Sequence, residues 1–156
     1  MDTYLTFVLG QELFAVSVRQ VLEVLQKQHI TRVPKTPDHV LGIINFRGDI
    51  LPVVDTRKKF SLSTSDENEK QIVIVFELGE EASKTTIAAT ADAVKDVIDI
   101  QDHEIKPVPE LGLDYNVKFI RGAVRKEETF ILMLDVEKVF SDTELSQLQK
   151  LTEVEK

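Results

Sequence analysis

Three histidines are the side chains best suited to proton transfer near neutral pH, because the ordinary pKa of histidine is about 6.5. They are His29, His39 and His103, and none stands at a metal-ligand spacing from another. A divalent-ion site would need acidic neighbours such as Asp38 and Asp102, yet acidic loops are common in a chain of net charge −8. Surface or capping histidines are the better interpretation, and we expect no metal site.

Nucleophilic and cofactor chemistry has little support in the other residues. The sequence contains no cysteine, which removes thiol nucleophiles, disulfides and cysteine-based metal sites. Serines cluster at 61–65, but no Gly-x-Ser-x-Gly elbow surrounds any of them. The 6 glycines are scattered singly, so neither a phosphate-binding loop nor a dinucleotide fingerprint is present. We therefore expect neither a cofactor nor a catalytic centre.

A small β-barrel enzyme is the alternative from another functional class. Its acids and bases would be Asp92, Asp96 and Asp99 together with the histidines. Against this alternative, the sequence offers no nucleophile, base and orienting group that can be placed together. A binding protein is the stronger interpretation.

The densest pattern of polar and apolar residues lies at 42–55, Gly-Ile-Ile-Asn-Phe-Arg-Gly-Asp-Ile-Leu-Pro-Val-Val-Asp. Asn45 and Arg47 alternate with Ile44 and Phe46, so the two polar side chains share one face of a strand. One interpretation is a simple hairpin turn, in which the asparagine satisfies local backbone groups and the arginine lies in solvent. The other is recognition, because the arginine fork suits a partner's carboxylate or helix end.

Length and charge limit the kinds of partner. A chain of 156 residues with 42% hydrophobic and 29% charged residues is typical of a globular protein with one domain, or two small ones sharing a core. Because the chain has 19 basic and 27 acidic residues, it repels phosphate backbones and anionic membrane surfaces, and we expect no nucleic acid partner. No apolar run could span a bilayer and the start lacks a secretory layout, so we expect a cytoplasmic protein without membrane insertion.

Apolar alternation and glycine turns predict a series of β-hairpins. A capping box at 17–20 predicts a short helical turn, and a second one at 141–144 opens a helix over 141–156 with leucines at helical spacing. The polar stretch 61–70 is predicted to be a loop. The hairpins are expected at 4–16, 40–54, 71–91 and 118–134.

A sparse internal repeat runs through the chain in constant order. It predicts a mainly β fold in which two five-stranded SH3-like β-barrel subdomains pack together and leave a groove at their seam. We expect the subdomains at about 17–85 and 86–140, with hairpin 4–16 packing across the seam. The matched segments are 17–24 with 90–97, 30–34 with 105–109, 47–48 with 121–122, and 55–60 with 135–140.

Segment 42–55 resembles the hallmark of the CheW-like family of bacterial chemotaxis adaptors, Gly-x-x-Asn-Leu-Arg-Gly followed by Pro-Val-x-Asp-Leu. The opening residues 4–16 and the closing residues 130–140 also resemble that family, so the resemblance covers almost the whole chain. Phe46 stands where the family has leucine, and Thr56 replaces the last leucine of the hallmark. The resemblance implies a single CheW-like domain over 1–156.

The resemblance also implies a function. It is that of a non-catalytic adaptor that couples the cytoplasmic tips of chemoreceptors to a chemotaxis histidine kinase in membrane-associated arrays and so regulates motility. The kinase's regulatory domain shares the fold, so adaptor and kinase would pair barrel to barrel. A same-fold adaptor in a related pathway that controls pili, gliding or gene expression is the alternative. The implied partner-binding residues are Asn45, Arg47 and Gly48 for the receptor, Val21 and Glu23 for the kinase or adaptor surface, and Gly42.

Overall fold

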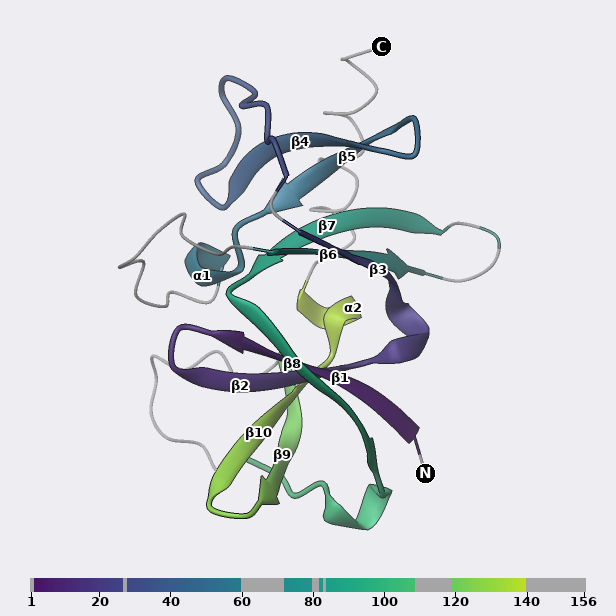
Figure 1. Ribbon diagram of the computed structural model, residues 1–156, viewed down its shortest axis with the longest axis vertical. Coiled ribbons are helices and arrows are strands. Elements are labelled where there is room, and N and C mark those ends of the chain that lie inside the picture. The colour runs from purple at the N-terminus through teal and green to yellow at the C-terminus, as the bar shows by residue number, and fades with distance from the viewer. Residues whose placement is uncertain are drawn as a thin grey trace.

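The computed structural model describes residues 2–26, 28–59, 72–79, 82, 84–108 and 119–139. Its strands form two five-stranded mixed sheets, a first sheet with the order β8-β1-β2-β10-β9 and a second with the order β3-β6-β7-β5-β4 (Figure 1). The predicted mainly β fold with two five-stranded units is confirmed. No helix in the described ranges is long and apolar enough to cross a membrane. The predicted loop 61–70 and helix 141–156 lie outside these ranges.

Each of the two sheets contains five strands. The first sheet contains β1 (Asp2–Leu9), β2 (Glu12–Ser17), β8 (Ala93–Ile100), β9 (Ile120–Lys126) and β10 (Thr129–Leu134). The second contains β3 (Val21–Leu25), β4 (Val40–Phe46), β5 (Asp49–Val54), β6 (Ile72–Leu78) and β7 (Thr85–Ala91). The single helical turns with described bounds are η1 (Val18–Gln20), α1 (Thr56–Lys59), η2 (Asp102–Glu104) and α2 (Val136–Val139).

The two sheets are not formed by consecutive halves of the chain. Hairpin β1–β2 is part of the first sheet, whereas β7 belongs to the second, and the chain crosses between them at Asp92. The Asp92 N–H donates to the Val8 carbonyl over 2.9 Å, which directs the chain onto the free edge of β1. Strand β8 went unpredicted because residues 93–97 are all exposed and show no apolar alternation.

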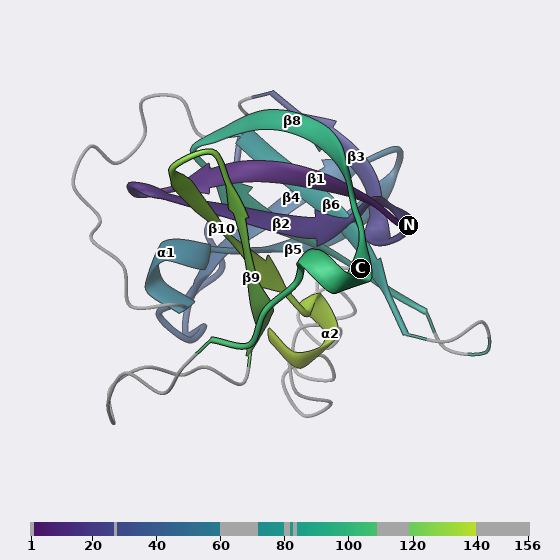
Figure 2. The same cartoon turned by 90° about the horizontal axis from the view of Figure 1, so that it is seen from below.

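One hydrophobic core is shared by the two sheets. Phe7 and Phe14 of the opening hairpin stack with ring centroids 6.1 Å apart, and they pack in one cluster with Ile74 and Phe76 of β6. The turn α2 lies between the sheets (Figures 1 and 2) and adds its valines to the same cluster. Burial of this kind of apolar surface, at about 25 cal/mol per Å², holds the sheets together.

Strand pairing shows which positions of the two sheets correspond. Val40 pairs with Val54, and 80 residues later Ile120 pairs with Leu134. By this register the counterpart of Gly42 is Gly122, whereas the predicted match of Arg47-Gly48 with Arg121-Gly122 is wrong. Gly42 and Gly122 correspond for a physical reason. Each lacks a side chain, and a second backbone segment crosses close to it, at the bridges Thr31–Ile43 and Lys106–Ala123.

The turn η2 has a pH-dependent cap. The Gln101 N–H donates to Glu104 Oε1 over 2.8 Å, and Lys126 Nζ donates to Oε2 over 2.9 Å. The backbone bond, followed by the lysine, lowers the pKa of Glu104 from its ordinary value of 4.5. Because the pKa is lower in the folded state, this contribution to stability is full above pH 4.5 and disappears as pH falls through the folded-state pKa.

We therefore expect Glu104→Gln to be less stable than the wild type at pH 7, with the difference shrinking as the pH is lowered past the carboxyl titration. Urea unfolding of both proteins at several pH values measures it. A difference that stays constant with pH would contradict the assignment.

Candidate functional site

The β4–β5 turn presents Arg47 to solvent. Arg47 has φ +53° and Gly48 has φ +90°, which is the left-handed backbone of a tight two-residue hairpin. The Gly48 N–H donates to Asn45 Oδ1 over 3.0 Å. Asn45 and Gly48 thus have the turn-forming role that was one of the two predicted interpretations, and together they fix the direction in which the arginine leaves the strand.

The Arg47 side chain is held by two contacts. Its Nη2 donates to Glu23 Oε1 of β3, and its guanidinium carbon lies 4.8 Å from the centroid of the Phe46 ring, a cation–π arrangement. The arginine side chain is nevertheless 67% exposed, and that of Glu23 is 36% exposed. Strands β3 and β4 are the two opposite edges of the second sheet, so the ion pair joins edges that meet only because the sheet curls.

The predicted partner residues separate into two groups. Asn45, Gly48, Arg47 and Glu23 gather at one end of the second sheet, which we call the Arg47 surface. Gly42 is buried, and a Cβ there would lie 2.1 Å from the Thr31 carbonyl oxygen, so it serves backbone packing. Val21 is half-buried against the shared core.

Leu22 is an apolar neighbour of the Arg47 surface that sequence reasoning missed. Val21 pairs with Phe76 and Glu23 with Val75, so Leu22 is the extra residue of a β-bulge. Its side chain is 43% exposed. The strand pattern gave no sign of a bulge, because Leu22 reads as one more residue of an apolar run.

The corresponding end of the first sheet has different charges. Asp96 corresponds to Glu23, because it pairs with Thr6 of β1 in the way that Glu23 pairs with Val75 of β6. Glu127 corresponds to Arg47, because it occupies the same position of its hairpin turn 80 residues later. Two acids replace the ion pair there. The two ends of this pseudo-symmetric molecule therefore differ in charge, and only the end in the second sheet offers an exposed, held arginine.

The residues of the enzyme alternative do not form a common site. Asp92 accepts from Arg57 over 2.5 Å, and Asp99 accepts from the Thr3 hydroxyl over 2.7 Å. Asp96 lies exposed on β8 between them. In the part of the chain that the structure describes, no group of three or more histidines or acids could hold a metal ion.

Comparison with known proteins identifies the family of the chain. A family model described as a CheW-like domain matches residues 3–144. The chain belongs to the CheW-like family. Among relatives called chemotaxis protein CheW, that of Klebsiella aerogenes is 29% identical over 92% of this chain and 84% of its own. That of Treponema pallidum is 30% identical over 94% of this chain and 86% of its own.

A solved structure of the CheW-like family supports both fold and function. The crystal structure of the scaffolding protein TtCheW from Thermoanaerobacter tengcongensis matches with a TM-score of 0.77 and 29% identity, over 90% of this chain and 92% of that one. The predicted resemblance is thus confirmed. The chain is a chemotaxis adaptor of the scaffold type, without catalytic activity, and the enzyme alternative is set aside.

Proposed function

We propose that this adaptor couples chemoreceptors to a chemotaxis histidine kinase and that the Arg47 surface is its receptor contact. The observation that carries the proposal is an arginine that is held by contacts with Glu23 and Phe46 and is nevertheless exposed. Exposed ion pairs add little to stability, typically about 0–1 kcal/mol. The value of this pair lies instead in fixing the arginine before a partner arrives, which lowers the entropy cost of binding.

The chemistry of the surface fits the end of a partner helix. A guanidinium fork donates to carboxylates and to the free carbonyl oxygens at a helix C-terminus. The apolar side chain of Leu22, beside Glu23 on β3, can bury against the same partner. An arginine next to apolar area is the composition typical of interface hot spots.

The kinase would bind a separate surface. The proposed partner on that side is the kinase's regulatory domain, which pairs barrel to barrel with the adaptor and leaves the Arg47 surface for the receptor. The adaptor then works in the cytoplasm at membrane-associated receptor arrays. It transmits signals through the complex that it holds together, and regulates motility in that way.

We expect Arg47→Glu to weaken receptor binding by about thirtyfold, the effect of losing a hot-spot arginine. The variant places a carboxylate beside Glu23 in a surface-exposed turn, so the fold should persist. The measurement is recovery of receptors and kinase from native lysate on the immobilised chain. Arg125→Glu, an exposed arginine on β9, is the matched control.

Selective loss of receptors with Arg47→Glu, while the kinase is still recovered, supports the proposal. Undiminished receptor recovery by a folded Arg47→Glu variant would refute the receptor contact. Recovery of neither receptors nor kinase by the wild type would refute the coupling function, and recovery of proteins of pili or gliding would favour the alternative pathway.

A further inference from the structure

Two contacts between the sheets use the same device, a carboxylate that accepts from the N–H of a glycine after a strand. The first, which we call the Asp92 clasp, begins at Gly10 after β1, whose N–H donates to Asp92 Oδ2 over 2.7 Å. The other oxygen of Asp92 accepts from Arg57 of α1 over 2.5 Å. Because α1 follows β5, this clasp ties the helical turn of the second sheet to the opening hairpin of the first.

The second contact, the Glu137 clasp, joins the helical turn of the first sheet to a hairpin of the second. The N–H of Gly79, after β6, donates to Glu137 Oε1 over 2.6 Å. Glu137 lies on α2, which follows β10 of the first sheet. Glu137 is the counterpart of Arg57, 80 residues later in the repeat, so each helical turn reaches across to a hairpin of the other sheet.

The clasps differ in their exposure to water. The side chains of Arg57 and Asp92 are 11% and 20% exposed, whereas both Glu137 and Gly79 are exposed. A charge-assisted hydrogen bond gains strength where water is excluded, because the effective dielectric constant falls. The Asp92 clasp is therefore the stronger of the two.

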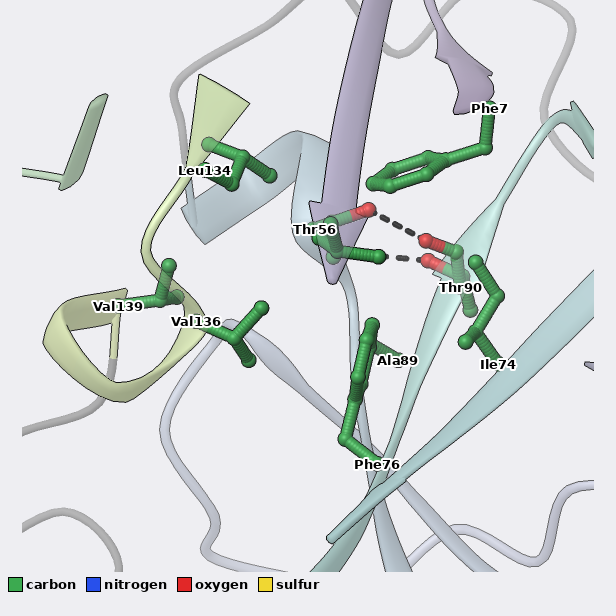
Figure 3. Close-up of a pocket in the computed structure, with 10 residues that line it drawn as sticks. Phe7, Thr56, Ile74, Phe76, Ala89, Thr90, Leu134, Val136 and Val139 are labelled. Atoms are coloured by element: carbon green, nitrogen blue, oxygen red, sulfur yellow. Dashed lines mark hydrogen bonds between the residues drawn. The ribbon is translucent and has the colours of Figure 1, made fainter. Parts of the chain in front are cut away.

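The two helical turns line one cavity in the shared core. A cavity of about 20 Å³ lies in the shared core, lined by Phe7, Phe76, Leu134 and others (Figure 3). At its α1 wall the Thr56 hydroxyl donates to the Thr90 carbonyl over 2.6 Å. At its α2 wall stand the apolar side chains of Val136 and Val139. Both turns line the same void, but α1 is also held to β7 by this hydrogen bond, whereas the α2 side chains at the cavity are apolar and form none.

We propose that the Glu137 clasp is a releasable latch between the two sheets. When it opens, α2 and the first sheet turn away from the β6–β7 end of the second sheet, and the Asp92 clasp stays closed and acts as the pivot. This device goes beyond the adaptor function and does not depend on which partners bind.

Selective ¹⁵N-glycine labelling tests the latch directly, because the chain has 6 glycines and two of them report on the two clasps. We expect the Gly79 amide to exchange with solvent about tenfold faster than that of Gly10, the effect of one charge-assisted hydrogen bond. Glu137→Ala should raise Gly79 exchange about tenfold further and leave Gly10 unchanged. Glu128→Ala, an exposed acid of the β9–β10 turn, is the matched control and should change neither.

Spin-label distances show whether the sheets move. The chain has no cysteine, so Lys84→Cys and Glu128→Cys would carry one label on each sheet's side. A wider distance distribution in Glu137→Ala, together with faster Gly79 exchange, supports the latch. Faster Gly79 exchange with an unchanged distribution would mean a local contact only and would overturn it, as would equal exchange of Gly10 and Gly79 in the wild type.

Discussion

Gly42→Ala should lower the free energy of unfolding by about 3 to 5 kcal/mol, the combined scale of overpacking and a forced left-handed backbone. Gly42 has φ +155°, and a Cβ added there would lie 2.1 Å from the Thr31 carbonyl oxygen. Thr31 cannot yield easily, since its N–H and carbonyl form bonds of 2.9 and 2.8 Å with Ile43. A domain stable by about 5 to 15 kcal/mol would lose much of its folded population.

Two other glycines serve as graded controls for Gly42→Ala in urea unfolding. A Cβ added at Gly10 would meet nothing within 4 Å, so Gly10→Ala should cost only about 1 kcal/mol for its positive φ. In Gly122→Ala the added Cβ would lie 2.6 Å from the Ile105 side chain and 2.7 Å from the Lys106 carbonyl oxygen, but the backbone there does not have the positive φ of Gly42, so the cost should be intermediate. If Gly42→Ala were no worse than Gly10→Ala, the close approach of Thr31 would be wrong.

The second large effect is expected from Asp92→Ala, at about 3 kcal/mol of lost stability. The change removes the carboxylate that Arg57 contacts in a site where the arginine is 11% exposed. It also removes the acceptor of the Gly10 N–H. Desolvating a guanidinium without this partner is what makes the change costly.

Chemical unfolding of Asp92→Ala and of the double variant Arg57→Met, Asp92→Ala measures this effect. The double variant should be the more stable of the two, because it no longer buries the charge. Asp49→Ala removes an exposed acid at the start of β5 and should change stability by less than about 0.5 kcal/mol. Equal stabilities of Asp92→Ala and Asp49→Ala would contradict the buried ion pair.

Local chemistry made most of the hairpins predictable. The alternation of apolar residues and the glycines at 10 and 48 place β1, β2, β4 and β5 within a residue or two of their observed bounds. Strand β8 could not be found in this way, because an exposed edge strand lacks a buried face and therefore lacks the pattern. The membership of β1 and β2 in the same sheet as β10 could not be predicted either, since the parallel pairing of β2 with β10 joins segments more than 100 residues apart.

The candidate site was predictable to the same extent. The Asn45 and Gly48 turn and the exposure of Arg47 follow from the local sequence. The contact of Arg47 with Glu23 does not, because it joins opposite edges of a curled sheet. Gly42 was grouped with the partner residues because the family hallmark contains it, but a hallmark records packing needs as well as recognition.

The first sheet combines strands from both ends of the chain, so the two sheets become complete at different times during synthesis. The second sheet has all its strands once Ala91 has been made, but the first must wait for Leu134 of β10. At about 5–20 residues per second on the ribosome, hairpin β1–β2 spends several seconds without the neighbours it will acquire. The Arg47 surface belongs entirely to the second sheet, so this end of the adaptor is complete while the rest of the chain is still being translated.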